Sequence, residues 1–331
     1  MIIDLHAHVV PEHFPMNVGS GASPWPIMEH LASGDADMMI GGNKFRTFRD
    51  TAWDAAKRAD DLPNIAMDKQ VLSPLPELLM YHLTPKDGAA LASHMNESIA
   101  RMVEARPDHY YGLGSAPLQD IELAVAELAR VKELGLAGVE IRSNIEGANL
   151  GEPRFRPFFK EAERLGLAIF VHAYNSTLQS RLDHLPSGVW ENHLAYPMEC
   201  GLAGASLIWS GVLADCPDLR ICMSHGGGVL TQMLARSDGV HRTRKPIAEL
   251  LPEAPMDYAR RMYYDDLAYN IPTIRYIIDS MGASQMTIGT DYSGASVRTM
   301  DPLSEFDALG LSSTEREQIG SGNALRFLGV A

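Results

Sequence analysis

The stretch Ile2-Ile3-Asp4-Leu5-His6-Ala7-His8 decides how the rest of this sequence is interpreted. Its apolar, partly β-branched residues predict a short buried strand. Side chains two positions apart on a strand point the same way, so His6 and His8 should project together from its C-terminal end. Two such imidazoles could form half of a metal site, although a core histidine followed by a loop histidine would give the same pattern.

The composition excludes several classes of partner. The chain has 331 residues, 46% of them hydrophobic, and a formal net charge of −14. An acidic chain without a run of Lys or Arg repels phosphate backbones and anionic lipid, so we expect neither nucleic acid nor membrane as a partner. No apolar segment reaches the ~20 residues that span a bilayer. The N-terminus shows no signal-peptide pattern, and Cys200, Cys216 and Cys222 form no CxxC pair, so we expect reduced thiols in a cytoplasmic protein.

Residues 11–50 differ from the regular pattern that follows them. Prolines at positions 11, 15, 24 and 26 break any helix in this stretch. The alternation in Lys44-Phe45-Arg46-Thr47-Phe48 predicts a hairpin strand. Thr51 is the predicted cap of a helix over 52–65. A connection of this length is usually functional, so we expect 11–50 to be an insertion near an active-site mouth.

Beyond residue 65, predicted strands and helices alternate at intervals of roughly 30 to 40 residues, as βα units require. With the first strand, eight strands are predicted, and an open doubly wound sheet is the alternative to a closed barrel. We favour one (β/α)8 TIM-barrel domain over 1–331, because eight units close a barrel and no GxGxxG follows the first strand. The later predicted strands are 71–74, 110–116, 139–142, 167–172, 219–225, 263–265 and 286–291. The predicted helices are 86–105, 120–134, 154–165, 198–214, 272–281 and 313–327.

Four of these strands end in a residue that can bind a metal or move a proton. Besides His6 and His8, these residues are His172, His225 and Asp291. In a (β/α)8 barrel the C-terminal strand ends surround one mouth, so residues far apart in the sequence would meet there. Core packing could explain any one of them, but it explains less well why polar residues occupy the same position on four strands.

Short motifs with a family resemblance are spread along nearly the whole chain. They are Asp4-x-His6-x-His8, Phe45-Arg46, Gly112-Leu113-Gly114, Phe170-Val171-His172, Ser224-His225-Gly226-Gly227-Gly228, Gly289-Thr290-Asp291-Tyr292 and Gly322-Asn323-Ala324-Leu325 with Phe327-Leu328-Gly329. These motifs resemble the amidohydrolase superfamily. The His-Gly-Gly-Gly element and the Phe-Arg pair narrow the resemblance to its branch of metal-dependent decarboxylases.

The resemblance implies a single metal ion and no organic cofactor. Zn²⁺, with Mn²⁺ as an alternative, would be bound by His6, His8, His172 and Asp291, leaving one position for water. His225 would not be a ligand but a general base beside that water, and Asp291 would serve as both ligand and proton shuttle.

The resemblance also implies how a substrate is held. Arg46 matches an arginine that binds a substrate carboxylate, and Arg236 matches one that enters the neighbouring subunit's site, which implies a homodimer. Either residue could instead be an ordinary surface arginine. Tyr174 and Trp190 could form an aromatic wall for a planar substrate, or they could simply pack in loops.

The implied reaction is decarboxylation of a small unsaturated or aromatic carboxylic acid by means of metal-bound water or hydroxide. A metal-dependent hydrolase or hydratase on the same barrel and a non-catalytic binding scaffold are the alternatives. Residues after His172 and after Asp291-Tyr292 depart from the branch's pattern, so the substrate stays open. Glu140 could bridge a second metal ion, or it could be a buried carboxylate outside the ligand set.

Overall fold

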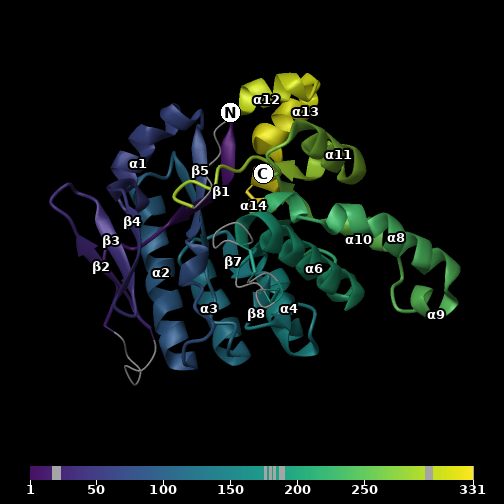
Figure 1. The fold of residues 1–331 in the computed structure, drawn as a ribbon, viewed down its shortest axis with the longest axis horizontal. Helices are drawn as coiled ribbons and strands as arrows, with labels where there is room; N and C mark the ends of the chain where they lie inside the picture. Colours follow the sequence, from purple (N-terminus) through teal and green to yellow (C-terminus); the bar gives the residue numbers. More distant parts are fainter. Residues whose placement is uncertain are drawn as a thin grey trace.

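Eight parallel strands form the centre of the molecule (Figure 1), and each pairs with the next one along the chain. The computed structural model describes residues 1–16, 24–174, 177–178, 181, 184–185, 191–294 and 301–330. The strands are β1 (Ile3–Val9), β5 (Lys69–Pro74), β6 (Tyr110–Gly114), β7 (Gly138–Arg142), β10 (Ala168–His172), β11 (Ile221–Met223), β12 (Tyr263–Asp265) and β13 (Met286–Thr287). All eight predicted strands are present.

The sheet closes on itself where the segment after β13 meets β1. The Leu5 N–H donates to the Ile288 carbonyl at 2.8 Å, and the His8 N–H donates to the Tyr292 carbonyl at 2.9 Å. Isolated bridges join the same two segments in parallel. The predicted (β/α)8 barrel is therefore confirmed.

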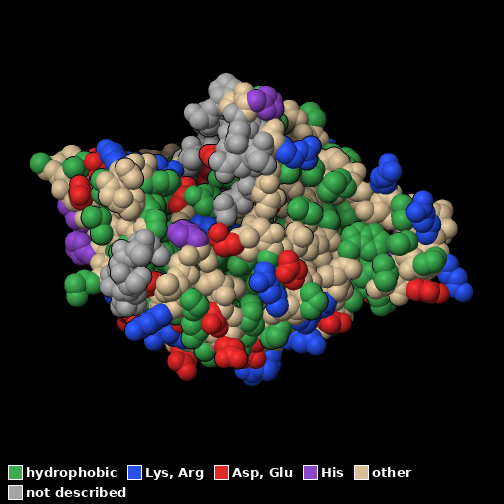
Figure 2. Space-filling view, turned by 60° about the horizontal axis from the view of Figure 1, so that its bottom comes forward, with side chains coloured by type: hydrophobic (Ala, Val, Ile, Leu, Met, Phe, Trp, Pro, Cys, Tyr) green, Lys and Arg blue, Asp and Glu red, His purple; other side chains and the backbone are tan. Residues whose placement is uncertain are grey.

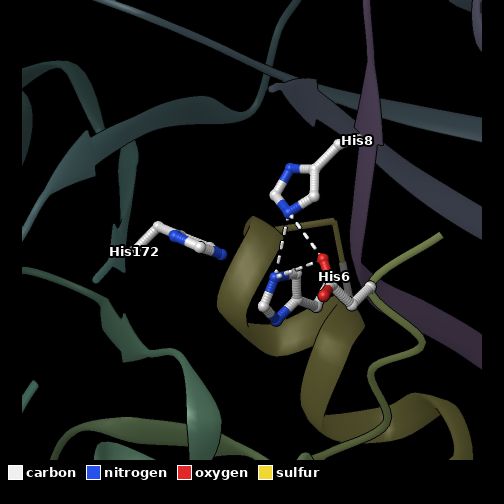
Figure 3. A group of neighbouring side chains, drawn as sticks. His6, His8 and His172 are labelled. Atoms are coloured by element: carbon white, nitrogen blue, oxygen red, sulfur yellow. Dashed lines mark hydrogen bonds and ion pairs between the residues drawn. The ribbon is translucent and has the colours of Figure 1, made fainter. Parts of the chain in front are cut away.

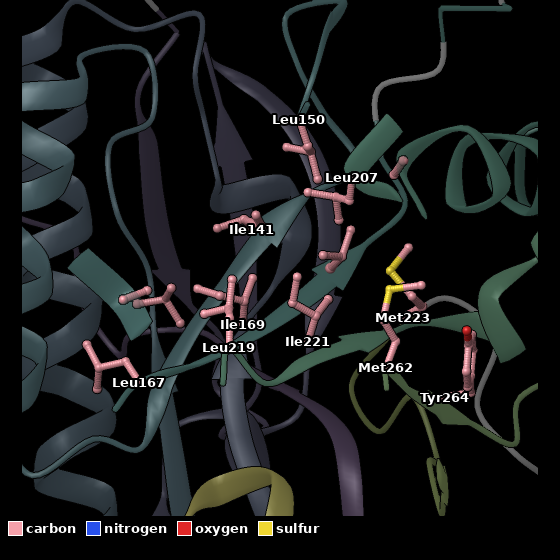
Figure 4. Packing of buried hydrophobic residues seen from close by; sticks show 14 of the residues in the cluster. Ile141, Leu150, Leu167, Ile169, Leu207, Leu219, Ile221, Met223, Met262 and Tyr264 are labelled. Carbon is pink, nitrogen blue, oxygen red and sulfur yellow. The ribbon is translucent and has the colours of Figure 1, made fainter. Parts of the chain in front are cut away.

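Helices cover the outside of the barrel because each has one apolar face (Figure 1). In α2 (Pro85–Ala105) the predicted face of Leu91, Met95, Ile99 and Met102 is buried. The other long helices are α3 (Ile121–Glu133), α4 (Arg156–Leu165), α6 (Tyr196–Trp209), α8 (Leu230–Thr243) and α11 (Ile271–Met281). Figure 4 shows the layer between sheet and helices, where Ile169 and Ile221 pair across β10 and β11 and pack in one cluster with Leu207 of α6.

A second apolar cluster fills the barrel and is closed at its base by α14 (Asn323–Leu328). Leu5, Leu113 and Phe170 belong to this cluster together with Phe327. The pairing of β1 with β5 shifts register between Asp4 and Ala7. Such a bulge turns the strand locally, so Leu5 joins the inner core while the next residue, His6, faces Phe170 with ring centroids 5.0 Å apart.

Residues 26–48 form a separate antiparallel sheet of β2 (Pro26–His30), β3 (Ala36–Ile40) and β4 (Asn43–Phe48). The predicted hairpin strand is confirmed as β4. Strands β2 and β3 were not predicted; β2 begins with a proline and is mostly exposed in the structure. Proline is tolerated there as the first residue of an edge strand.

Several predicted helix boundaries were wrong for local reasons. The helix expected over 52–65 is α1 (Ala55–Asp61), and its cap is Asp54, whose carboxylate accepts from the Ala56 and Lys57 N–H groups, rather than Thr51. The helix expected over 198–214 is broken by Gly211 at φ 79° into α6 and α7 (Val212–Asp215). The helix expected over 313–327 is α13 (Ser313–Glu317), a π-helical turn at Gln318–Gly322, and α14.

No helix was predicted in the segment between β11 and β12. It contains α8, α9 (Lys245–Ala248) and α10 (Pro255–Ala259), which extend to the side of the barrel in Figure 1.

In the described part of the chain, no helix combines the length and apolarity needed to cross a bilayer. Figure 2 shows Lys and Arg mixed with Asp and Glu on the face in view, without a continuous basic patch.

Candidate active site

Four buried side chains from three parts of the barrel meet at its C-terminal mouth (Figure 3). His6 and His8 come from β1, His172 ends β10, and Asp291 follows β13. One ligand atom from each lies within 4.8 Å of those of the other three. The Nε2 atoms of His6 and His8 are 3.1 Å apart, and Asp291 Oδ1 lies 3.2 Å from His8 Nε2. The structure therefore brings together the four residues that the resemblance assigned to a metal.

The far ring nitrogen of each histidine is held by an oxygen acceptor. The contacts are His6 Nδ1 to Asp265 Oδ2 at 2.6 Å, His8 Nδ1 to Pro74 O at 3.0 Å and His172 Nδ1 to Ala173 O at 2.8 Å. A carbonyl or carboxylate oxygen can only accept, so in a neutral ring Nδ1 holds the hydrogen. Each Nε2 then presents a lone pair to the shared centre.

This arrangement fits a divalent cation. Within the described part of the chain, His172 Nε2 is buried without a hydrogen-bond partner. Burial, together with the neighbouring imidazole of His6, lowers the pKa of His172 well below its usual value. Burial alone would raise the pKa of Asp291, but the imidazoles of His8 and His6 hold it below its ordinary range. Three imidazole lone pairs and one carboxylate suit Zn²⁺ and also accommodate Mn²⁺.

Asp265 connects this centre to the loop after β11. Burial alone would raise the pKa of Asp265, but the hydrogen bond and charge of His6, together with His225 and the Gly226 N–H, hold it below its usual value. Its second oxygen, Oδ1, accepts from the Gly226 N–H at 2.9 Å. One carboxylate thus orients His6 and fixes the turn that presents His225.

Asp4 links β1 to the segment that follows β13, next to the group of metal-side residues. Its carboxylate accepts from the His6 N–H at 3.1 Å, the Thr290 N–H at 3.0 Å, the Thr290 hydroxyl at 2.6 Å and Gln70 Nε2 at 2.7 Å. Asp291, which follows Thr290, has a backbone φ of 55°, and this conformation is strained for a residue with a Cβ. Its N–H donates to the His6 carbonyl at 2.8 Å, so this seam holds the strained ligand in place.

His225 lies beside the four-residue group and outside it. Its ring centroid is 5.0 Å from that of His172, and its Nδ1 is 3.3 Å from the Ser224 hydroxyl. Burial lowers the pKa of His225 to about 4, so its ring is neutral near pH 7 and can accept a proton. The glycines that follow are required, because a Cβ on Gly228 would collide with the Pro197 carbonyl oxygen.

A cavity of about 540 Å³ opens above these groups. Its wall joins metal-side residues to residues from turns and helix ends, which suits an enclosed small molecule. The residues lining it are His8, Leu75, Pro76, Glu77, His172, Tyr174, His193, Tyr196, Pro197, His225, Gly228, Val229, Gln232, Leu267, Ala268, Tyr269, Thr273, Asp291 and Gly294.

Comparison with known proteins identifies the family. Residues 3–330 match the Amidohydrolase family. The chain is 34% identical over 337 residues to a 2-amino-3-carboxymuconate-6-semialdehyde decarboxylase of Dictyostelium discoideum, covering 99% of this chain and 91% of that protein. The chain belongs to the amidohydrolase family. This predicted membership is confirmed, and the proteins that this amidohydrolase resembles include decarboxylases, which are carboxy-lyases.

Two further relatives of this amidohydrolase differ in chemistry. A 2-keto-4-carboxy-3-hexenedioate hydratase of Sphingobium sp. is 25% identical over 358 residues, covering 98% of this chain and 95% of that protein. A dihydroxybenzoic acid decarboxylase of Polaromonas sp., solved with manganese and 2-nitroresorcinol, has a TM-score of 0.77 at 20% identity, covering 99% of this chain and 97% of that one. The second comparison shows the shared fold.

The four predicted substrate residues of the amidohydrolase differ in placement. Tyr174 lines the cavity, and its ring centroid lies 4.3 Å from the Arg142 guanidinium carbon. Arg46 is not part of the described cavity wall; its Nη2 lies 3.9 Å from Glu77 Oε1, which does face the cavity. Arg236 is exposed on α8. Trp190 falls outside the described residues.

The sequence interpretation missed Glu77, His193 and Tyr196 in the cavity wall. Glu77 had a usable signal, since it follows the end of a predicted strand like the metal-side residues. His193 and Tyr196 come from the start of α6 and the π-helical turn before it, Glu191–Ala195, where position relative to a strand gives no guide.

Glu140 is fully buried on the far side of His8 from the centre. Its Oε2 lies 3.6 Å from His8 Nδ1, and it is not part of the four-residue group. Neither carboxylate oxygen has a hydrogen-bond partner among the described residues. Burial raises the pKa of Glu140 to about 8. This position favours a buried carboxylate behind a ligand over a bridge between two metal ions.

Proposed function

We propose that this amidohydrolase is a metal-dependent decarboxylase of a small aromatic or unsaturated carboxylic acid, with no organic cofactor. The observation that most supports this is the convergence of three histidine lone pairs and Asp291 beside a cavity whose wall also contains a neutral His225. The decarboxylases among its relatives point the same way.

His6, His8, His172 and Asp291 would hold the metal ion. Zn²⁺ suits the donor set, and the manganese of the Polaromonas enzyme makes Mn²⁺ the alternative. A divalent cation supplies Lewis acidity there and lowers the pKa of a coordinated water.

His225 is the residue that moves the proton in this proposal. Its Nδ1 faces the Ser224 hydroxyl at 3.3 Å, so Nε2 is the atom available to the substrate. His225 Nε2 takes a proton from solvent and passes it to the carbon that bears the carboxylate. The bond from that carbon to the carboxylate then breaks, its electron pair returns to the unsaturated system of the substrate, and CO₂ leaves in exchange for the proton. The carboxylate of Asp291 can relay the same proton as a shuttle.

The remaining predicted residues would bind the substrate. Tyr174 supplies an aromatic face whose far side is stacked on buried Arg142. Trp190 is proposed as the second aromatic group of this wall. Arg46 is proposed to offset the negative charge of the substrate from its place behind Glu77.

We also propose that the active unit is a homodimer in which Arg236 reaches the neighbouring subunit's site. Arg236 is exposed one turn beyond Gln232, which lines the cavity. Exposed apolar side chains gather on α6 and α8, which are in contact: Met198, Leu202 and Met233. Burying such a patch favours association of two copies. The three free cysteines fit the cytoplasm as the compartment.

The experiment that tests this proposal follows the carboxylate carbon of the substrate and the oxygen of water. The protein loaded with Zn²⁺ or Mn²⁺ is given hydroxybenzoates and carboxymuconate-like acids in ¹⁸O-water, and CO₂ release is measured beside ¹⁸O incorporation. Release of CO₂ without ¹⁸O in the organic product supports decarboxylation. Incorporation of ¹⁸O without CO₂ supports a hydratase or hydrolase, which the Sphingobium relative makes the second candidate. Protein that binds no metal would support the binding scaffold.

A further inference from the structure

Glu77 is an acidic side chain of the cavity wall that the proposed reaction does not use. It lies on the 3₁₀ turn Pro76–Leu78, directly after β5. Pro74, at the end of the same strand, accepts the hydrogen bond of His8 Nδ1. The strand that orients a metal-side histidine therefore also brings Glu77 to the same rim.

The backbone around Glu77 is fixed from behind. Buried Arg142 donates from Nε to the Pro76 carbonyl at 3.2 Å and from Nη2 to the Glu77 carbonyl at 3.4 Å. The Leu78 N–H closes the turn on the Leu75 carbonyl at 2.8 Å. Leu78 itself is buried in an apolar cluster. This support holds the Glu77 side chain against the cavity, where it is 15% exposed.

The Glu77 carboxylate keeps capacity to accept hydrogen bonds from a ligand. Its cation, Arg46, lies 3.9 Å away, which is beyond hydrogen-bond length. Arg46 is in turn held over the Phe48 ring with 4.7 Å between guanidinium carbon and centroid. Burial raises the pKa of Glu77, and the charge of Arg46 offsets part of that rise. A carboxylate offers about four acceptor positions, so the pair leaves Glu77 open on its cavity side.

We propose that Glu77 determines substrate specificity by accepting a hydrogen bond from a hydroxyl or amino substituent. The cavity then selects monocarboxylic acids that bear such a donor, of the hydroxybenzoate or aminobenzoate class. A second substrate carboxylate in the same place would be repelled by the negative charges of Glu77 and Asp291, which both line the cavity. Dicarboxylic acids are therefore disfavoured. This inference rests on the proposed function in taking a carboxylic acid as the substrate, and it adds that the carboxylate of that acid lies on the metal side.

Equilibrium binding tests this inference separately from turnover. Calorimetry on the metal-loaded protein compares benzoate with the 2-, 3- and 4-hydroxybenzoates, the aminobenzoates and the benzenedicarboxylates. We expect at least one hydroxy or amino isomer to bind about tenfold more tightly than benzoate, because a hydrogen bond to a charged acceptor contributes that much. In Glu77→Gln this preference should fall to within about twofold, and the corresponding dicarboxylate should gain about tenfold.

Glu191→Gln is the matched control, since it removes the same charge from an exposed residue that does not line the cavity. It should keep the wild-type order of affinities. Thermal unfolding and metal content of Glu77→Gln are measured first, to show that this variant folds and binds metal. Glu77→Asp keeps the charge but has a shorter side chain, so it should lose the preference for hydroxy or amino acids without binding dicarboxylates more tightly. An unchanged preference in folded Glu77→Gln, or a panel that does not bind at all, overturns the inference. Donor-selective binding without CO₂ release retains it and rejects the decarboxylase instead.

Discussion

The two sides of the cavity are built differently. On the metal side, His6, His8 and His172 each have Nδ1 fixed by a carbonyl or carboxylate oxygen. In the rest of the wall, Glu77 and Tyr174 come from a turn and a loop that follow strand ends. Strand pairing positions the first set, because the register of neighbouring strands is closed around the whole barrel.

This difference separates reaction chemistry from substrate choice. Groups fixed by strand register cannot move without disturbing the barrel, whereas residues on connecting segments can change while the scaffold stays the same. Changes on the metal side should therefore abolish the reaction, and changes in the rest of the wall should shift which molecule binds.

The largest effect is expected from His172→Ala. Removing one of three imidazole ligands should reduce bound metal to less than about a tenth of the wild-type content and lower kcat/KM by about 10³-fold or more. Elemental analysis and CO₂ release measure the two quantities. His193→Ala is the control for metal content, because His193 lines the cavity outside the four-residue group. Full metal content in His172→Ala would break the comparison at its strongest point.

The second-largest effect is expected from His225→Ala. The ring lies outside the ligand group, so the metal content should stay at the wild-type level while kcat falls by about 10² to 10⁴-fold. Elemental analysis and steady-state kinetics on the same preparation give both values. Loss of the metal in this variant would instead make His225 a ligand and remove it as the proton carrier.

These two sites show what the sequence could predict. His172 ends β10 and His225 follows β11 by two residues, and both lie at the mouth as predicted because the ends of parallel strands meet there. The eight strands were found for the same reason, since buried strands are short apolar runs with regular spacing. The departures occurred where local geometry decides: Asp54 caps α1 in place of Thr51, and Gly211 ends α6 early.

The far wall of the cavity could not be predicted in the same way. His193 and Tyr196 reach the cavity from helical turns, and their contact with it depends on how α6 packs against the barrel. Arg46 was chosen by resemblance, yet the structure places Glu77 between it and the cavity. An ion pair between an insertion and a strand end is a tertiary contact, so neither partner's local sequence reveals it.

Arg46→Ala should sharpen the comparison with a smaller effect. Removing the cation behind Glu77 leaves that carboxylate uncompensated, so KM for an anionic substrate should rise about tenfold while kcat stays within about twofold. Arg49→Ala is the matched control, since Arg49 is exposed and pairs with Asp61 instead. Equal KM values for Arg46→Ala and the wild type would remove Arg46 from substrate binding.

The smallest effect is expected behind the metal side, at Glu140. Burial raises the pKa of its carboxyl from the ordinary 4.5 to about 8 in the folded protein. Between these pH values the folded state holds a proton that the unfolded chain has lost, so the stability of the wild type should fall as pH rises through this window. Glu140→Gln stays neutral throughout and should avoid that loss.

The melting temperature of metal-free Glu140→Gln should therefore match the wild type near pH 5 and exceed it by about 2–5 °C near pH 8. Scanning calorimetry with a chelator present measures the difference at each pH, and subtracting the two proteins cancels the titration of groups they share. A difference independent of pH would show that Glu140 is ionised in the fold. Metal content should be unchanged in Glu140→Gln, because its oxygens approach the Nδ1 side of His8 while the shared centre lies at Nε2.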